Sequence, residues 1–458
     1  SILIDVTASE EVSEIYPDML ASSVHVVTAN KIAASAPYHV YRHMKELALA
    51  LQTESDYRVK CSILRALQNY DYKDVHLTFL TSTSDDNPHV AEVAAEYFVM
   101  KGQEKDAARY KAAMKDCKSW QAKTRMAEAA NKNTTSMFSS AKTALQNEIK
   151  AALGDAKDPY EKAAWLKAWS SELRNFESIQ KYTLADQPIP VRTQAVTSLI
   201  DACRDKNFDA YFAGEGYLIK AQIGGYLATA MKSGDPGIIA LIAGAISDPK
   251  TGLKEIFKER KTDLNKALAG LKLPEEMETY LEVTKALKEY GMDAPAVPED
   301  QKKYKSIDWK LIDQLKPGST VQLTTSRGEI TIALYPDRAP VSVTSFLQLA
   351  KEGYYNGKSF HRVVPNFVIQ TGCPRGDGFG GLDFTLRSEL AGTYYDDEGY
   401  VGMASAGPHT EGPQFFITHS PSPHLDGRYT IIGKVTSGMD VVHKTEIGDT
   451  IKQINIRY

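Results

Sequence analysis

The chain has 458 residues, 43% of them hydrophobic, and a formal net charge of −4. This length allows about two to four domains, and the small net charge excludes bulk electrostatic attraction to nucleic acid or anionic membranes as the basis of function. No apolar run approaches the roughly 18 residues that a membrane-spanning helix needs, so we expect no membrane span.

The four cysteines are scattered and form no CxxC pair; they are Cys61, Cys117, Cys203 and Cys373. This usage favours isolated thiols over disulfides or zinc ligands. We find no metal-ligand spacing and expect no metal and no cofactor. The sequence leaves the compartment open between the cytoplasm and, for a chain from which a signal peptide has been removed, the periplasm.

Residues 1–50 predict a partial α/β unit. Apolar runs at residues 2–6 and 24–27 predict two strands, and residues 41–51 predict a helix. Strands that alternate with helices are typical of a parallel sheet. Two strands cannot cover both faces of such a sheet, so we interpret the segment as a structural cap or a fusion remnant.

Part of this segment, residues 5–9 and 26–31, resembles homoserine dehydrogenase. The resemblance implies that Asn30 and Lys31 correspond to the pair that lies beside the nicotinamide cofactor in that family. The Gly-rich dinucleotide turn is absent, and helices follow where that family has its substrate domain. An NADP-dependent homoserine dehydrogenase fragment is therefore only the remote alternative for function.

Residues 51–290 predict consecutive amphipathic helices. Acidic or polar residues precede several prolines that are typical of helix starts, namely Pro88, Pro159, Pro188, Pro236 and Pro249. The region resembles HEAT-type repeats, in which helix pairs stack into a solenoid. An irregular all-α bundle is the alternative. A solenoid predicts that the helices at Pro88, Pro188 and Pro236 begin on one edge.

Trp165 and Trp169 are four residues apart and therefore share one helix face. They could form a peptide-binding stripe, but core packing is the favoured interpretation. Residues 291–317 then predict an acidic, Pro-rich linker, followed by a short helix at residues 308–315 that braces the last domain.

From residue 318 to 458 the pattern changes to strands. Residues 321–325 and 329–335 flank a hairpin turn, and residues 341–353 predict a helix. The remaining expected strands are residues 360–371, 400–404, 415–418 and 429–435. Together they predict a closed antiparallel barrel, so the expected fold class is multidomain: helical HEAT-like repeats, a C-terminal β-barrel and a short N-terminal α/β segment.

Four motifs in this last domain agree in order and spacing with one family. They are residues 359–372 around Arg362, the Gly-rich turn at 376–381, residues 402–407, and residues 412–418. This set resembles the cyclophilins, which are peptidyl-prolyl cis-trans isomerases of β-barrel fold. The resemblance implies rotation of X-Pro bonds in protein clients, assistance to protein folding, and proline-containing polypeptides as substrates.

The chemistry requires no nucleophile, because rotation about an amide makes and breaks no bond. Resonance sets a barrier of roughly 18–20 kcal/mol. A fixed donor aimed at the prolyl nitrogen stabilises the twisted state, and an apolar pocket holds the ring. Arginine suits this role, since it stays charged and presents a rigid fork of N–H groups.

The resemblance implies roles for individual residues. Arg362 is the catalytic arginine, and Gln370 orients it. The implied substrate-binding residues are Phe367, Val368, Phe416 and Leu425 in the proline pocket, the backbone of Ala404 and Ser405, the side chain of Gln414, and His424 and Tyr429 at the rim. Tyr429 stands where many members carry His and His424 where many carry Trp, so we do not carry tight cyclosporin binding over from the family. The alternative function is a chaperone-like binding scaffold with little turnover, and the helical repeats are the expected surface for a protein partner.

Overall fold

The computed structural model describes residues 2–5, 25–28, 46, 48–135, 139–293, 295–315, 318–390 and 392–457. It contains two compact units, Ser1–Gly154 and Asp155–Tyr458. Among the described residues, no helix is both long and apolar enough to cross a membrane.

The first unit begins with two strands that pair in parallel, β1 (Ile2–Asp5) and β2 (His25–Thr28). The sequence predicted both strands, whereas Asn30, Lys31 and most of the expected helix at residues 41–51 lie outside the described residues. The helices that follow are α5 (Tyr57–Leu67), α6 (Tyr72–Ser82), α7 (Pro88–Lys101), α8 (Ala107–Asp116), α9 (Trp120–Asn133) and α10 (Ser140–Asp155).

The second unit continues with a long helical segment. Its helices are α11 (Pro159–Ser170), α12 (Phe176–Ile179), α13 (Ile189–Arg204), α14 (Phe208–Tyr211), α15 (Gly216–Met231), α16 (Pro236–Ser247), α17 (Leu253–Ile256), α18 (Lys261–Gly270), α19 (Met277–Glu289) and α20 (Trp309–Ile312). Trp165 and Trp169 are both buried, so the favoured interpretation of core packing is confirmed. Four of these helices pack in a row: α11 contacts α13, α13 contacts α16, and α16 contacts α19.

The acidic residue before a proline caps helices as expected at two sites in this unit. Asp158 Oδ1 accepts from the N–H groups of Tyr160 and Glu161, and Asp235 Oδ1 accepts from those of Gly237 and Ile238. The prediction that a helix starts at Pro249 is wrong. Asp248 instead ends α16, where it accepts from Arg204 and from the Lys250 N–H, and α17 begins only at residue 253.

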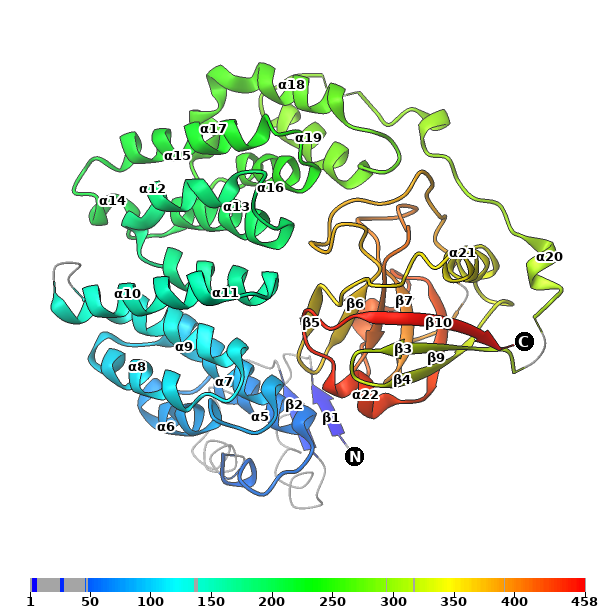
Figure 1. Ribbon diagram of the computed structural model, residues 1–458, viewed down its shortest axis with the longest axis horizontal. Coiled ribbons are helices and arrows are strands. Elements are labelled where there is room, and N and C mark those ends of the chain that lie inside the picture. Colours follow the sequence, from blue (N-terminus) through cyan, green and yellow to red (C-terminus); the bar gives the residue numbers. More distant parts are fainter. Residues whose placement is uncertain are drawn as a thin grey trace. The chain divides into compact units, whose positions relative to one another are not determined.

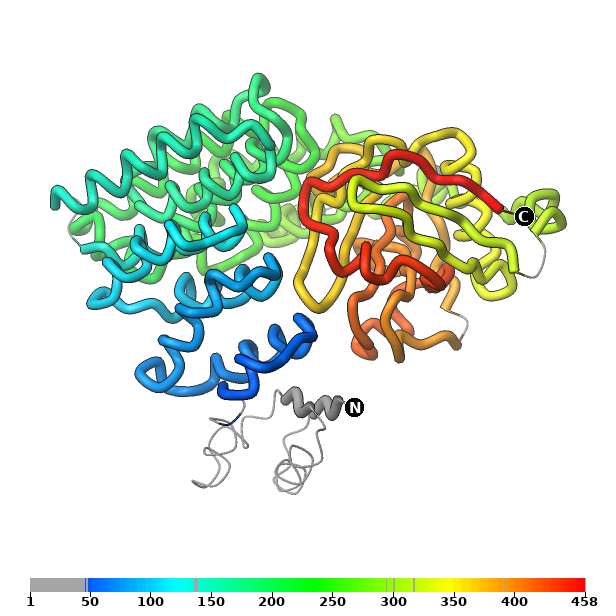
Figure 2. Tube along the Cα trace, turned by 60° about the horizontal axis from the view of Figure 1, so that its bottom comes forward, coloured from blue at the N-terminus to red at the C-terminus, as the bar shows by residue number. Residues whose placement is uncertain are grey.

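The sheet of the second unit is wholly antiparallel and has the strand order β10-β3-β4-β9-β7-β8-β6-β5. Its strands are β3 (Thr320–Thr325), β4 (Glu329–Leu334), β5 (Arg362–Val364), β6 (Val368–Thr371), β7 (Tyr400–Met403), β8 (Phe415–Thr418), β9 (Ile431–Ser437) and β10 (Ile451–Arg457). The two ends of the sheet meet through backbone bonds from Phe360 N to Asp449 O (2.7 Å) and from Ile451 N to Lys358 O (2.9 Å). Figure 1 and Figure 2 show the resulting barrel, with α21 (Pro340–Lys351) and α22 (Met439–Lys444) against it.

The predicted single strand at residues 360–371 is wrong, because β5 and β6 form a hairpin. Pro365 has no N–H to donate to a ladder, and Asn366 takes a left-handed φ of 56°. The chain therefore turns between residues 364 and 368, and Arg362 pairs across the hairpin with Gln370.

The segment before the barrel packs on it through Leu311 of α20, which is 4% exposed and belongs to the barrel core. Lys305 lies over the Phe384 ring, 4.0 Å from its centre, and Asp308 accepts from the Gln348 side chain.

Candidate active site

The hairpin positions the two polar side chains that the sequence singled out as catalytic. Arg362 and Gln370 are directly opposite in the register of β5 and β6. Arg362 Nη1 donates to Gln370 Oε1 at 3.4 Å, a long hydrogen bond. Strand alternation turns the neighbouring His361 inward, where it is 8% exposed, while Arg362 faces solvent.

A row of amides continues from this arginine. Gln370 Nε2 donates to Gln414 Oε1 at 3.1 Å, and Gln414 Nε2 donates to the carbonyl oxygens of Gly378 (2.8 Å) and Gly380 (3.3 Å). The orientation of Gln370 is thereby coupled to the backbone of a Gly-rich loop, residues 373–381.

An apolar cluster lies in the same part of the barrel. Val368, Phe416 and Leu425 are buried in it, and half-buried Phe367, Ala404 and Tyr429 pack against them. The Phe416 ring is edge-on to Tyr429 at 5.7 Å, and the Arg362 guanidinium lies 6.0 Å from the centre of the Phe367 ring. The cluster gives an apolar surface beside a cation.

Gly402 makes this packing possible. It is opposite Phe416 in the register of β7 and β8. A Cβ at residue 402 would lie 2.3 Å from both Phe416 Cζ and the Tyr395 hydroxyl. Only a residue without a side chain leaves room for the two rings.

The remaining predicted site residues lie around this cluster. Ala404 donates its N–H to the Gln414 carbonyl at 3.0 Å, and Ser405 follows it as a half-buried residue. His424 is exposed, and its ring tilts against Phe367 with the centres 5.2 Å apart. The fold thus brings all of the predicted site residues to one side of the barrel, from β5 to the loop before β9.

Burial shifts the pKa values of two neighbouring basic groups. It lowers the pKa of Arg362 below its usual range, against the opposing effect of Tyr429. It also lowers the pKa of His361 to about 4. His361 is therefore neutral near pH 7, where an arginine remains charged. In the part of the chain that the structure describes, no group of three or more His, Cys, Asp or Glu side chains could hold a metal ion.

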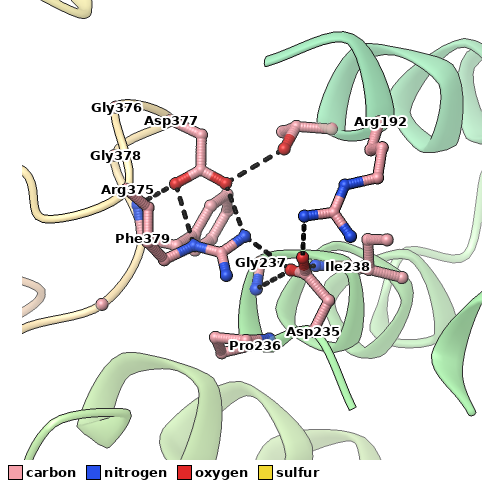
Figure 3. A network of polar contacts seen from close by, with 12 residues as sticks. Arg192, Asp235, Pro236, Gly237, Ile238, Arg375, Gly376, Asp377, Gly378 and Phe379 are labelled. Carbon is pink, nitrogen blue, oxygen red and sulfur yellow. Dashed lines mark hydrogen bonds and ion pairs between the residues drawn. The ribbon is translucent and has the colours of Figure 1, made fainter. Parts of the chain in front are cut away.

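Sequence reasoning missed a set of ion pairs that binds the 373–381 loop to the helices (Figure 3). Arg375 Nη2 bonds Asp235 Oδ1 at 2.6 Å and Asp377 Oδ2 at 3.0 Å, and Arg192 Nη2 approaches Asp235 Oδ2 at 3.0 Å. The Thr193 hydroxyl donates to Asp377 at 3.0 Å. Burial alone would lower the pKa of Arg375, but its bonds with Asp377 and Asp235 raise it. No local pattern marks the contacts between the loop and the helices, because Arg375 and Asp235 are 140 positions apart and Thr193 and Asp377 are 184 apart.

A barrel that places a cation beside an apolar cluster can hold an apolar ring next to a hydrogen-bond donor. The family profile described as cyclophilin type peptidyl-prolyl cis-trans isomerase/CLD matches residues 320–457. Peptidyl-prolyl cis-trans isomerase B of Bacillus subtilis is 46% identical over 129 residues, which are 28% of this chain and 90% of that protein. Peptidyl-prolyl cis-trans isomerase ppi1 of Schizosaccharomyces pombe is 48% identical over 130 residues, 27% of this chain and 82% of that protein.

A crystal structure of a cyclophilin type isomerase from Cryptosporidium parvum matches with 34% identity and a TM-score of 0.29, covering 31% of this chain and 98% of that one. On the strength of the sequence relatives, the chain belongs to the cyclophilin-type peptidyl-prolyl cis-trans isomerases. It is an isomerase that acts on proline-containing peptides, and its family domain occupies the C-terminal third of the sequence.

Proposed function

We propose that Arg362 performs the isomerisation in this chain and that Gln370 holds it in place. The observation that carries this proposal is the hydrogen bond between the two side chains across the hairpin, next to the apolar cluster of Phe367, Phe416 and Leu425. A proline ring on that cluster places its nitrogen near the guanidinium. Donation to this nitrogen favours the twisted amide, in which the nitrogen regains its lone pair.

The peptide path in this proposal runs along Ala404 and Ser405, whose backbone groups bind the substrate, with the Gln414 side chain as a further contact. His424 and Tyr429 form the rim. Because both residues differ from those common in the family, we propose that cyclosporin binds weakly.

We further propose that residues 51–290 are HEAT-like repeats that hold clients while the barrel at 318–458 isomerises them, so that the chain assists protein folding as a chaperone. The packing of four helices in a row, α11 on α13 on α16 on α19, supports stacking of this kind. Residues 1–50 and 291–317 are, in this proposal, a cap and a linker. The buried positions of Trp165 and Trp169 leave the client surface to other residues.

A pair of assays on the full chain tests these roles. Arg362→Ala should abolish most turnover of a proline peptide, with Arg338→Ala as the control, because Arg338 is an exposed arginine of the same barrel that pairs with Asp337. The same variants are then tested for suppression of client aggregation. Turnover unaffected by Arg362→Ala would refute the catalytic role. Aggregation suppressed by neither parent nor variant would refute the client-holding role.

A further inference from the structure

A cavity of about 150 Å³ lies beside the amide row and has walls from two parts of the chain. Gln370, Gln414 and the segment around Ala404 and Ser405 form the barrel side. Glu275 and Glu278, at the start of α19, belong to the helical side. The helices therefore contribute directly to a cavity that adjoins Gln370 and Gln414.

Hydrogen bonds and ion pairs join the helical side of the cavity to the barrel at several points. Glu275 O accepts from the Gly381 N–H at 2.7 Å, and the Tyr160 hydroxyl donates to Gly376 O at 2.7 Å. The ion pairs of Arg375 in Figure 3 add a third attachment, at the start of α16. Buried Thr279 in turn bonds α19 to the Pro236 carbonyl at 3.0 Å. The beginnings of α11, α13, α16 and α19 thus meet the 373–381 loop, which fixes the position of Glu275 and Glu278.

Three carboxylic acids line the cavity, namely Glu275, Glu278 and Glu411, and in the described part of the chain none of them pairs with a cation. Burial, and then the charges of Glu282 and Asp377, raise the pKa of Glu278. Among the described residues, neither Glu275 nor Glu278 forms an ion pair. Glu411, which is fully buried, also lines the cavity, and its Oε2 has no hydrogen-bond partner in the described part of the chain. Carboxylates held together in this way are stabilised by an incoming cation.

We propose that this cavity receives a lysine or arginine side chain of the substrate, and that Glu278 with Glu275 sets a preference for basic residues near the X-Pro bond. A cavity of this volume can hold a group of about the size of benzene, so the end of either side chain fits. The inference rests on the peptide path proposed along Ala404 and Ser405, because a chain on that path places a side chain over the cavity. The helical segment is then a specificity element of the isomerase as well as a scaffold.

The test measures kcat/KM for peptides that carry one Lys, Gln or Glu at each of the three positions on either side of the X-Pro bond. With the parent chain, we expect one position at which Lys exceeds Glu by about tenfold, mainly through KM. In the double variant Glu275→Gln, Glu278→Gln this ratio should fall to about twofold. Glu289→Gln, on the far end of α19 and paired with Lys254, should leave the ratio unchanged.

Two results would overturn the inference: a Lys-to-Glu ratio within twofold at every position of the parent, or a ratio that survives in the double variant. Either result is separable from a failure of the proposed function. If the proposed function is wrong, Arg362→Ala keeps its turnover. If only the inference about the cavity is wrong, Arg362→Ala is still inactive and the parent chain shows no preference for Lys that depends on Glu275 and Glu278.

Discussion

The rings of Phe416 and Tyr395 leave no room for a side chain at Gly402. Gly402→Ala forces Phe416 or Tyr395 to move, because the added Cβ would lie 2.3 Å from each. Overpacking of this kind costs typically about 1–3 kcal/mol. We expect a lower midpoint of thermal unfolding and weaker peptide binding. Gly412→Ala is the matched control in the same barrel, since nothing lies within 4 Å of its Cβ position. Equal stability of the two variants would contradict this account of the packing.

A second residue, Glu411, makes stability depend on pH. Burial, against the opposing bond from the Thr430 hydroxyl, raises its pKa from 4.5 to about 7. Between these values the folded chain keeps a proton that the unfolded chain has released, so this group lowers stability as pH rises from about 4.5 to 7.

Glu411→Gln removes this titration and keeps an oxygen for Thr430. The variant should gain stability relative to the parent between pH 5 and pH 8, by roughly 2–3 kcal/mol. Unfolding midpoints at pH 5, 6.5 and 8 measure the gain, with exposed Glu352→Gln as control. A gain that is constant over this range would show that Glu411 titrates normally.

The resemblance to the cyclophilins implied Arg362, Gln370 and the apolar side chains near them as a group, and the structure places these side chains close together. It missed Arg375, Asp377, Glu275 and Glu278. Their role depends on which helix start meets the 373–381 loop, and the spacing of residues along the chain carries no information about that.

Among the elements, the 373–381 loop connects the helices to the amide row. Asp235 accepts from Arg375 and Arg192 and also caps α16. Asp235→Asn preserves a good capping residue but removes the charge, so it isolates the ion pairs. Hydrogen exchange of the loop amides should become at least about tenfold faster. Asp248→Asn, which removes the more exposed pair with Arg204, serves as control and should leave the loop unchanged.

Unaltered exchange in Asp235→Asn would mean that the loop holds its shape without the helices.

The predicted and observed elements differ where single residues or contacts between distant residues decide the local structure. The strand at 415–418 was predictable as a short apolar run, and all four of its residues are buried. The hairpin at 362–371 was not, since Pro365 and Asn366 lie within an otherwise continuous apolar pattern. The absent helix at Pro249 reflects competition for Asp248, which bonds Arg204 and the Lys250 N–H.

At the scale of the whole molecule, the family domain fills the last third of the sequence, and helical segments of the same compact unit line a cavity beside its Gln370 and Gln414. A domain that acted alone would leave Glu275 and Glu278 without influence on the substrate. In our proposal, isomerisation and selection of the peptide belong to two segments that share a cavity.

The most direct test of this account is the turnover of Arg362→Lys in the full chain, measured on a proline peptide at saturating concentration. Lysine keeps the charge but lacks the planar fork by which, in our proposal, Arg362 contacts both Gln370 and the prolyl nitrogen. Loss of one preorganised donor typically costs about 10²–10³ in rate. We predict a loss in this range with an unchanged unfolding midpoint, because Arg362 is exposed. Turnover within threefold of the parent, in a folded variant, would contradict the central role of Arg362.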